Sequence, residues 1–480
     1  MPNHTSPRRS ELMGTQSVGK LLWRFSLPGV IGMLVNATYN LIDTIFVGGL
    51  GPDAIASVTV VFPIQMVMIA IGAGTGIGAA SLISRRLGEK RIDEANVAVG
   101  QTLGLVVIVG ALMALFGSTL GRPLLSVMGA SENIIGDAYS YMIVITSGAV
   151  IMFANIIGNN LIRAEGNPVL PMIAMITGAV INMGLDPLFI YVFKMGVQGA
   201  AVATITARGL ASILVLGYLL GGKTDYRIKI SQFIPRLKVW GQIYAVGGPH
   251  MLMSLVGSVS MGVSIRIAAM FGDQYIAAYG ILFRVMQYGF MPCIGIAQGA
   301  LPIIGYNFGA RKPLRVRHTV IKAALVSTAI TLGISAIAII FPEAIVKLFL
   351  LFQKVTEGTQ VAGAQSAEAI KNFRELASYA VRIAFIGFTL VGSQVIFATF
   401  FQGIGKALPA ALISISRQLL LLVPALLLLA FLVGKEAIWF AAPIADVGSF
   451  IISAIWTYAT MCKLGIGLWG KCKSPHEVTS

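Results

Sequence analysis

Long apolar stretches alternate with short polar segments along nearly the whole chain. A membrane-spanning helix needs about 20 consecutive, mostly apolar residues to cross the hydrocarbon core of a bilayer. The pattern predicts twelve transmembrane helices, at residues 22–48, 54–83, 95–120, 137–162, 169–193, 197–220, 243–270, 276–306, 317–341, 376–401, 408–433 and 437–461. We therefore expect an all-α integral membrane protein.

A polar segment separates the sixth predicted helix from the seventh, and it carries the basic residues Lys223, Arg227, Lys229, Arg236 and Lys238. This segment divides the chain into two six-helix bundles. The predicted parts are an N-terminal tail at 1–20, an N-lobe at 21–221, a linker at 222–242, a C-lobe at 243–465 and a C-terminal tail at 466–480.

The two halves are repeats of one another. When the first half is shifted by 221 positions, Pro28 aligns with Pro249, Phe62 with Phe283, and Gly88 with Gly309, without a gap. Two copies of a six-helix unit both start from the same side of the membrane, so they form parallel repeats with a cleft expected between them.

The second half also carries an additional stretch near Lys354–Ile370. It falls between predicted helices on the side of the membrane opposite the termini. We expect it to form a loop there.

Charged residues are scarce, at 11% of the chain, and the mean hydropathy is +0.84. About a quarter of the residues in a soluble domain are charged, so this composition indicates a membrane protein. The formal charge of +16 lies mostly in short clusters between apolar segments, which is the pattern of cytoplasmic loops. We therefore expect no nucleic-acid partner, and we predict a multi-pass protein of the plasma membrane with both termini in the cytoplasm.

Two carboxylates interrupt the apolar segments of the predicted N-lobe. Asp43 lies in the first predicted helix, and Asp186 lies in the fifth, four residues after Asn182 and directly before Pro187. A carboxylate near the bilayer centre costs about 2.5 kcal/mol or more, so it is usually paired, hydrated or functional. We interpret the two as an ion or proton site. The alternative is that each carboxylate only accepts hydrogen bonds inside its bundle.

The acidic pair belongs to one half of the chain. The repeat partner of Asp43 is Ser264, and the partner of Asp186 is Val423 or a near neighbour. Since repeats share a scaffold, function is expected where they differ.

The C-lobe spans carry a different set of charges in or beside them, namely Arg266, Arg284, Arg382, Arg417 and Asp446. One interpretation is that the arginines line a substrate cleft. The other is structural, with Arg417 or Arg284 paired with Asp446. The sequence leaves both open.

Other chemistry is not indicated. The chain has no Walker motif, and its four histidines are scattered, so neither an ATP-driven pump nor a metal cluster is predicted. We expect no cofactor.

Four motifs in order resemble the multidrug and toxic compound extrusion (MATE) family: LPGVIGMLVNATYNLIDTIFVGGLG, NNLIRAEGNP, INMGLDPLFIY and GVQGAAVATITAR. The resemblance covers about residues 15–465. It implies two lobes that alternate access across the membrane, and secondary active efflux of amphipathic organic compounds by antiport with protons or sodium ions.

The resemblance also implies a site. The residues that correspond to the N-lobe cation site of prokaryotic members are Asp43, Asn182, Asp186 and Thr204. A neighbouring hydrogen-bonded network would include Asn36, Tyr39, Tyr141 and Asn159. Another branch of the family has acids in helices seven and ten, where this chain has Arg266 and no acid, respectively. The resemblance therefore favours the branch with an N-lobe site.

The expected partners are small amphipathic substrates and the lipid bilayer, with the chain acting as a monomer. The expected coupling ion is H⁺ or Na⁺, and no other metal site is predicted. The alternative transporter function is flipping of a lipid or a lipid-linked oligosaccharide, which cationic C-lobe residues would suit. A membrane-embedded enzyme or receptor is the alternative from another class.

Overall fold

The computed structural model describes residues 9–222, 224–357 and 367–465, and every regular element in these ranges is helical. The first half consists of α1 (Arg9–Thr15), α2 (Val18–Gly48), α3 (Pro52–Gly88), α4 (Ile92–Val127), α5 (Ile135–Ser147), α6 (Ala149–Glu165), α7 (Val169–Pro187), the π-helix η1 (Leu188–Val192) and α8 (Gly196–Leu220).

A short 3-10 helix, η2 (Ile230–Phe233), lies in the linker. The second half consists of α9 (Leu237–Ala269), α10 (Asp273–Gly309), α11 (Pro313–Ile340), α12 (Pro342–Glu357), α13 (Ala367–Phe388), α14 (Val391–Gly403), α15 (Ala407–Ile415), the π-helix η3 (Ser416–Leu422), α16 (Val423–Leu432), η4 (Ala437–Phe440) and α17 (Ala441–Lys463).

The predicted all-α membrane architecture is confirmed. Within the described residues, 10 helices are long and apolar enough to span a membrane, or up to 12 if each of two bent pairs counts as one span. The first pair is α5 with α6, bent by 51°, and the second is α13 with α14, bent by 46°. Both bends fall in the fourth span of their half, so the repeat extends to the shape of the helices.

Two helices form where the sequence predicted a tail and a loop. α1 lies in the predicted N-terminal tail, and α12 follows the ninth predicted span. Neither has 20 apolar residues, so a search for spans does not detect them. The predicted loop near Lys354–Ile370 lies partly in the end of α12 and the start of α13, and partly outside the described residues.

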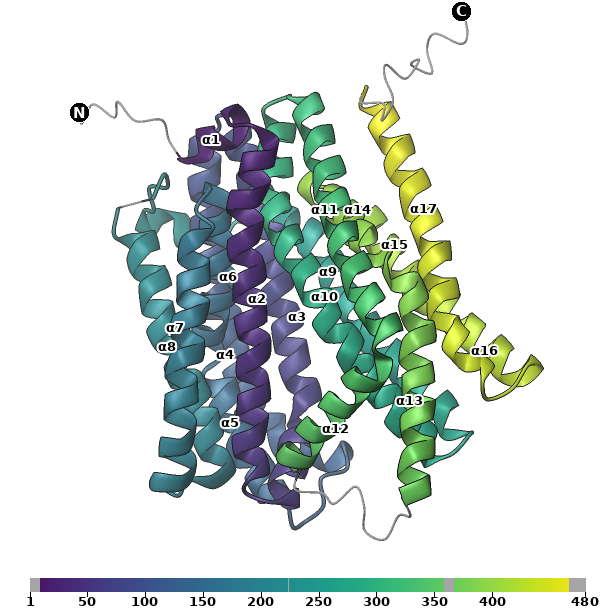
Figure 1. Ribbon diagram of the computed structural model, residues 1–480. Coiled ribbons are helices and arrows are strands. Elements are labelled where there is room, and N and C mark those ends of the chain that lie inside the picture. The colour runs from purple at the N-terminus through teal and green to yellow at the C-terminus, as the bar shows by residue number, and fades with distance from the viewer. Residues whose placement is uncertain (1–8, 223, 358–366, 466–480) are drawn as a thin grey trace, which may run out of the picture.

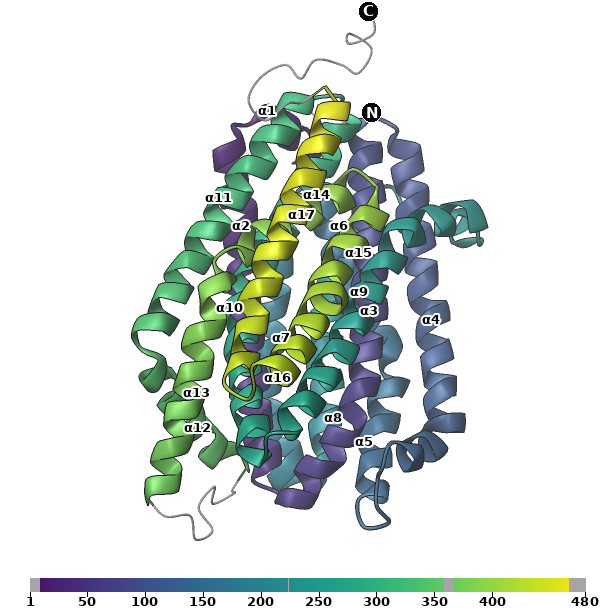
Figure 2. The same cartoon turned by 90° about the vertical axis from the view of Figure 1, so that its right-hand side faces the viewer.

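The two halves form two lobes that stand side by side in Figure 1, with α2–α8 in one and α9–α17 in the other. α1 and the last turn of α17 lie at the same end of the molecule, which we call the terminal face. Figure 2 shows the C-lobe, with α17 and α16 nearest the viewer. The main contacts between lobes are those of α2 with α10 and of α3 with α9.

Glycines allow the backbones of the two lobes to touch. A Cβ atom added at Gly74 on α3 would lie 2.8 Å from the carbonyl oxygen of Gly247 on α9. One added at Gly29 on α2 would lie 2.5 Å from the carbonyl oxygen of Gly295 on α10. Gly74 and Gly295 are repeat partners, separated by 221 positions. The same small-residue contact is therefore made twice, once on each side of the seam.

The glycine contacts between lobes occur in the half of the molecule nearer the terminal face, while α12 also packs on α2. There the Ser81 hydroxyl on α3 donates a 2.5 Å hydrogen bond to the carbonyl oxygen of Gln402 on α14. A Cβ atom at Gly299 on α10 would lie 2.8 Å from the carbonyl carbon of Phe25 on α2. The described conformation is thus closed at the terminal face.

We predict that Gly299→Val will destabilise the protein by about 1–3 kcal/mol, because the added side chain must displace the α2 backbone. The matched control is Gly333→Val on α11, where an added Cβ meets nothing within 4 Å. Thermal unfolding in detergent measures both. Equal melting temperatures for the two variants would contradict the close packing of the seam.

Candidate functional site

The two predicted N-lobe carboxylates meet in the structure. Asp43 lies on α2 and is partly buried, whereas Asp186 lies near the end of α7 and is 0% exposed. α2 packs directly on α7, and the two carboxyl groups lie in hydrogen-bonding contact with each other. Two ionised carboxylates offer only acceptors. Two ionised carboxylates at this separation repel each other, and an added proton or cation would relieve that repulsion.

The surroundings leave several oxygens of this pair without a donor. The side-chain amide of Asn182 donates a 3.1 Å hydrogen bond to Oδ1 of Asp186. Oδ1 of Asp43, Oδ2 of Asp186 and Oδ1 of Asn182 are buried and have no hydrogen-bond partner among the described residues. Buried polar atoms are normally paired, so these three oxygens can still accept hydrogen bonds or coordinate an ion.

Two tyrosines border the acidic pair, one on α5 and one on α2 itself. Tyr141 on α5 is buried, accepts a 3.0 Å hydrogen bond from the Gln65 amide on α3, and interacts electrostatically with Asp43. The hydroxyl of Tyr39, one turn before Asp43 on α2, accepts a 3.3 Å hydrogen bond from Arg208 on α8. Four elements thus converge on Asp43.

Arg208 and Gln65 were not among the residues predicted from the sequence. Arg208 interacts electrostatically with Asp43 and is the cation facing the acidic pair. One feature of the sequence could have indicated Arg208. It lies four residues after the predicted site residue Thr204, so the two share a helical face. Gln65 carried no signal, because only the packing of α3 on α5 brings it to Tyr141.

Among the described residues, the remaining predicted side chains do not join the hydrogen bonds of the acidic pair. In the described part of the chain, Thr204 and Asn36 make no side-chain hydrogen bond. Asn159 on α6 is buried and bonds Asn155 at 3.3 Å, with its own Oδ1 unpaired. Their predicted roles therefore stay predictions.

Pro187 shapes the backbone beside Asp186. Because proline lacks an N–H group, the regular α-helix α7 ends there and the chain continues as the π-helix η1. The Tyr191 hydroxyl on η1 donates a 2.6 Å hydrogen bond to the carbonyl oxygen of Phe46 on α2. This bond fixes η1, and with it the end of α7, against the helix that carries Asp43.

The C-lobe has no acidic pair at the equivalent place. Ser264, the repeat partner of Asp43, donates its hydroxyl to the carbonyl oxygen of Ser260 on its own helix. Instead, Arg417 at the start of η3 forms a 2.7 Å ion pair with Asp446 on α17. Asp446 is 1% exposed, and its backbone carbonyl accepts a 2.6 Å hydrogen bond from Gln394. The C-lobe charge is compensated internally.

The other predicted C-lobe charges lie apart from this ion pair. Arg266, near the end of α9, and Arg284, on α10, are both exposed. Of the two pairings considered from the sequence, the structure shows the one between Arg417 and Asp446. Among the described residues, no group of three or more His, Cys, Asp or Glu side chains could hold a metal ion.

Comparisons with known proteins agree with this architecture. The family model described as MatE matches residues 28–188 and 249–427. The chain is 28% identical to the multidrug export protein MepA of Staphylococcus saprophyticus, over 90% of this chain and 91% of the relative. It is 26% identical to an FAD transporter of Shewanella oneidensis, over 89% and 92%.

A solved structure is also similar. A MOP superfamily transporter from Pyrococcus furiosus superposes with a TM-score of 0.88 at 27% identity, covering 96% of this chain and 99% of that chain. This similarity spans both lobes.

We predict that Asp446→Ala will destabilise the protein by about 3 kcal/mol, because it leaves the Arg417 guanidinium partly buried without its carboxylate. The matched control is Glu375→Ala, which breaks an exposed 3.9 Å pair with Lys371 and should change stability by less than about 1 kcal/mol. Thermal unfolding in detergent compares the two. If the control lost as much stability as Asp446→Ala, the buried ion pair would contribute no more to stability than the exposed one.

Proposed function

The chain belongs to the MATE family of multidrug efflux transporters, and we propose that it expels amphipathic organic compounds in exchange for protons or sodium ions bound at Asp43 and Asp186. The carrying observation is the contact between these two carboxyl groups inside one lobe, with unpaired buried oxygens on both. Such a pair is favourable only when a proton or cation lies between its members.

The charges around the pair support a small coupling stoichiometry. Two carboxylates and the Arg208 guanidinium sum to one negative charge, so a single H⁺ or Na⁺ makes the group neutral. Either ion fits the donor set. A proton would complete the hydrogen bond between the carboxyls, whereas Na⁺ would use the free oxygens of Asp43, Asp186 and Asn182.

The position of Asp43 supports coupling to lobe movement. α2 carries Asp43 in its second half and carries Gly29 at the seam with α10 in its first half, directly after Pro28. The helix that packs on α7 at the acidic pair is therefore also the helix that contacts α10 of the other lobe. A change in the packing of α2 on α7 would alter that contact between the lobes. Ion and drug are coupled if they favour different lobe arrangements, and no direct contact between them is needed.

The orientation follows the charges of the loops. Basic residues gather at the terminal face, so we place that face in the cytoplasm and the protein in the plasma membrane. With the terminal face closed, the described conformation would face outward.

An amphipathic, often cationic substrate fits the charges of the lobes. Arg417 is neutralised by Asp446, which removes one of the cations that would have suited an anionic lipid substrate. A flippase or a membrane enzyme therefore has less support than efflux. The relative from Shewanella oneidensis is named an FAD transporter, so export of a particular anion stays a question for direct assay.

We predict that Asp43→Asn and Asp186→Asn will each lower gradient-driven drug efflux by roughly tenfold or more, because the neutral amide no longer binds the coupling ion. The assay is dye efflux from cells, normalised to the amount of protein in the membrane.

The matched control is Asp53→Asn, which changes an exposed carboxylate at the start of α3 in the same lobe. Its efflux should stay at the wild-type rate. Unchanged efflux in both site variants would rule out the coupling role of the pair.

We predict that, in proteoliposomes, a pH gradient or a Na⁺ gradient imposed alone will drive drug movement, and that Asp186→Asn will abolish the response to the active gradient. The gradient that drives movement identifies the coupling ion. Drug movement that responds to neither gradient would contradict antiport.

A further inference from the structure

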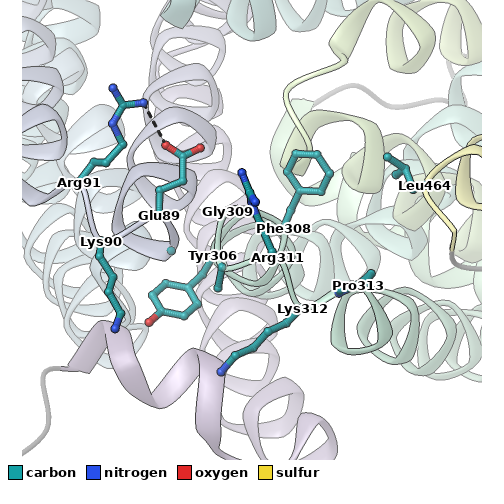
Figure 3. A pocket seen from close by; sticks show the side chains of 12 residues that line it. Glu89, Lys90, Arg91, Tyr306, Phe308, Gly309, Arg311, Lys312, Pro313 and Leu464 are labelled. Carbon is teal, nitrogen blue, oxygen red and sulfur yellow. Dashed lines mark ion pairs between the residues drawn. The ribbon is translucent and has the colours of Figure 1, made fainter.

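A cavity of about 1110 Å³ lies at the terminal face, between one turn from each lobe and remote from the acidic pair. Its walls are the turn between α3 and α4, the turn between α10 and α11, and Leu464 after α17. Figure 3 shows both turns with Tyr306 between Lys90 and Lys312. The cavity lies at the seam itself, since each lobe supplies one of the two turns.

The cationic residues of the cavity come in repeat-related pairs. Lys90 and Arg91 on the N-lobe turn correspond to Arg311 and Lys312 on the C-lobe turn, each separated by 221 positions. Lys90 and Arg311 both have positive φ, at 61° and 53°. The two turns therefore have the same backbone form, and they present two cations each to one cavity.

The positive charge of the cavity is only partly compensated. Four cations and one carboxylate, Glu89, line it. Glu89 is shared between Arg86 and Arg91, and the Lys312 ammonium donates a 2.9 Å hydrogen bond to the carbonyl oxygen of Gly14 on α1. Lys90 and Arg311 are exposed and have no carboxylate partner among the described residues. The positive-inside pattern explains basic residues at this face, but it doesn't explain two uncompensated cations from different lobes around one cavity.

We propose that this cavity binds an anion with two or more phosphate groups, which bridges Lys90 of the N-lobe and Arg311 of the C-lobe. Phosphate groups are multivalent acceptors that pair well with lysine and arginine. The cavity is large enough to admit an extended polyphosphate or a headgroup with several phosphates.

Such a ligand would favour the closed terminal face. The turns meet because Gly88 contacts the backbone at Tyr306, and Gly309 contacts the backbone at Arg85. These contacts separate when the lobes open at this face, and the cavity separates with them. A ligand that binds one arrangement better than the other shifts the population toward it. This consequence for transport rests on the proposed function, whereas binding itself doesn't.

The test measures binding of sodium tripolyphosphate to the full-length protein in nanodiscs of zwitterionic phosphatidylcholine, by isothermal titration calorimetry. We expect saturable binding that weakens with added salt, and a loss of affinity of roughly tenfold or more in Lys90→Gln/Arg311→Gln. The matched control is Arg227→Gln/Lys229→Gln, which removes two exposed linker cations outside the cavity. It should bind as the wild type does.

No saturable binding to the wild type, or equal affinity in all three proteins, would overturn the proposal. Nanodiscs with added phosphatidylinositol bisphosphate identify the source of the phosphates. If this lipid blocks tripolyphosphate binding, the natural ligand is a headgroup; if it doesn't, the ligand is a free polyphosphate.

A separate readout tests the closed state. Tripolyphosphate added at the terminal face of proteoliposomes should slow drug movement by the wild type and leave the Lys90→Gln/Arg311→Gln variant unaffected. If tripolyphosphate bound but did not slow drug movement, the binding site would be supported. The claim that the ligand favours the closed terminal face would be overturned. Absent drug movement before any addition would count against the proposed function and leave the calorimetric result standing.

Discussion

Backbone contact between the two lobes is the constraint on which the rest of the structure depends. Gly74 against Gly247, and Gly29 against Gly295, bring helices of opposite lobes within van der Waals distance. Lipid offers no hydrophobic drive for helices to associate, so such packing depends on small residues that let backbones approach. The contact is repeated on both sides of the seam, so both lobes rely on the same kind of small-residue packing.

The two lobes use buried charge in opposite ways on the same scaffold. In the C-lobe, Arg417 and Asp446 neutralise each other in a 2.7 Å ion pair. In the N-lobe, Asp43 and Asp186 face each other, and Arg208 interacts electrostatically with Asp43. An ion pair of opposite charges, such as Arg417 with Asp446, stabilises one arrangement of helices. A pair of carboxylates, such as Asp43 with Asp186, responds to an added proton or cation.

One helix connects these two features. α2 carries Asp43 toward one end, packs on α7 through its middle, and meets α10 at Gly29. Pro28, beside that glycine, removes a backbone hydrogen bond and makes the helix easier to bend there. The same helix therefore carries a residue of the proposed ion site and also forms part of the seam, as the proposed coupling of an ion to the lobe arrangement would require.

Much of this could be predicted from the sequence, because local composition decides it. Apolar length determines the membrane spans, and alignment of Pro28 with Pro249 reveals the repeat. A carboxylate in an apolar helix, as at Asp43, is a candidate site that the sequence alone reveals. Tertiary packing alone decided the rest. Arg208 and Gln65 join the site because α8 and α3 lie beside α2 and α5, and Asp446 takes Arg417 as its partner because α17 packs on η3. Partners distant in sequence leave no local periodic signal, so only the folded chain shows which charges are compensated and which remain open.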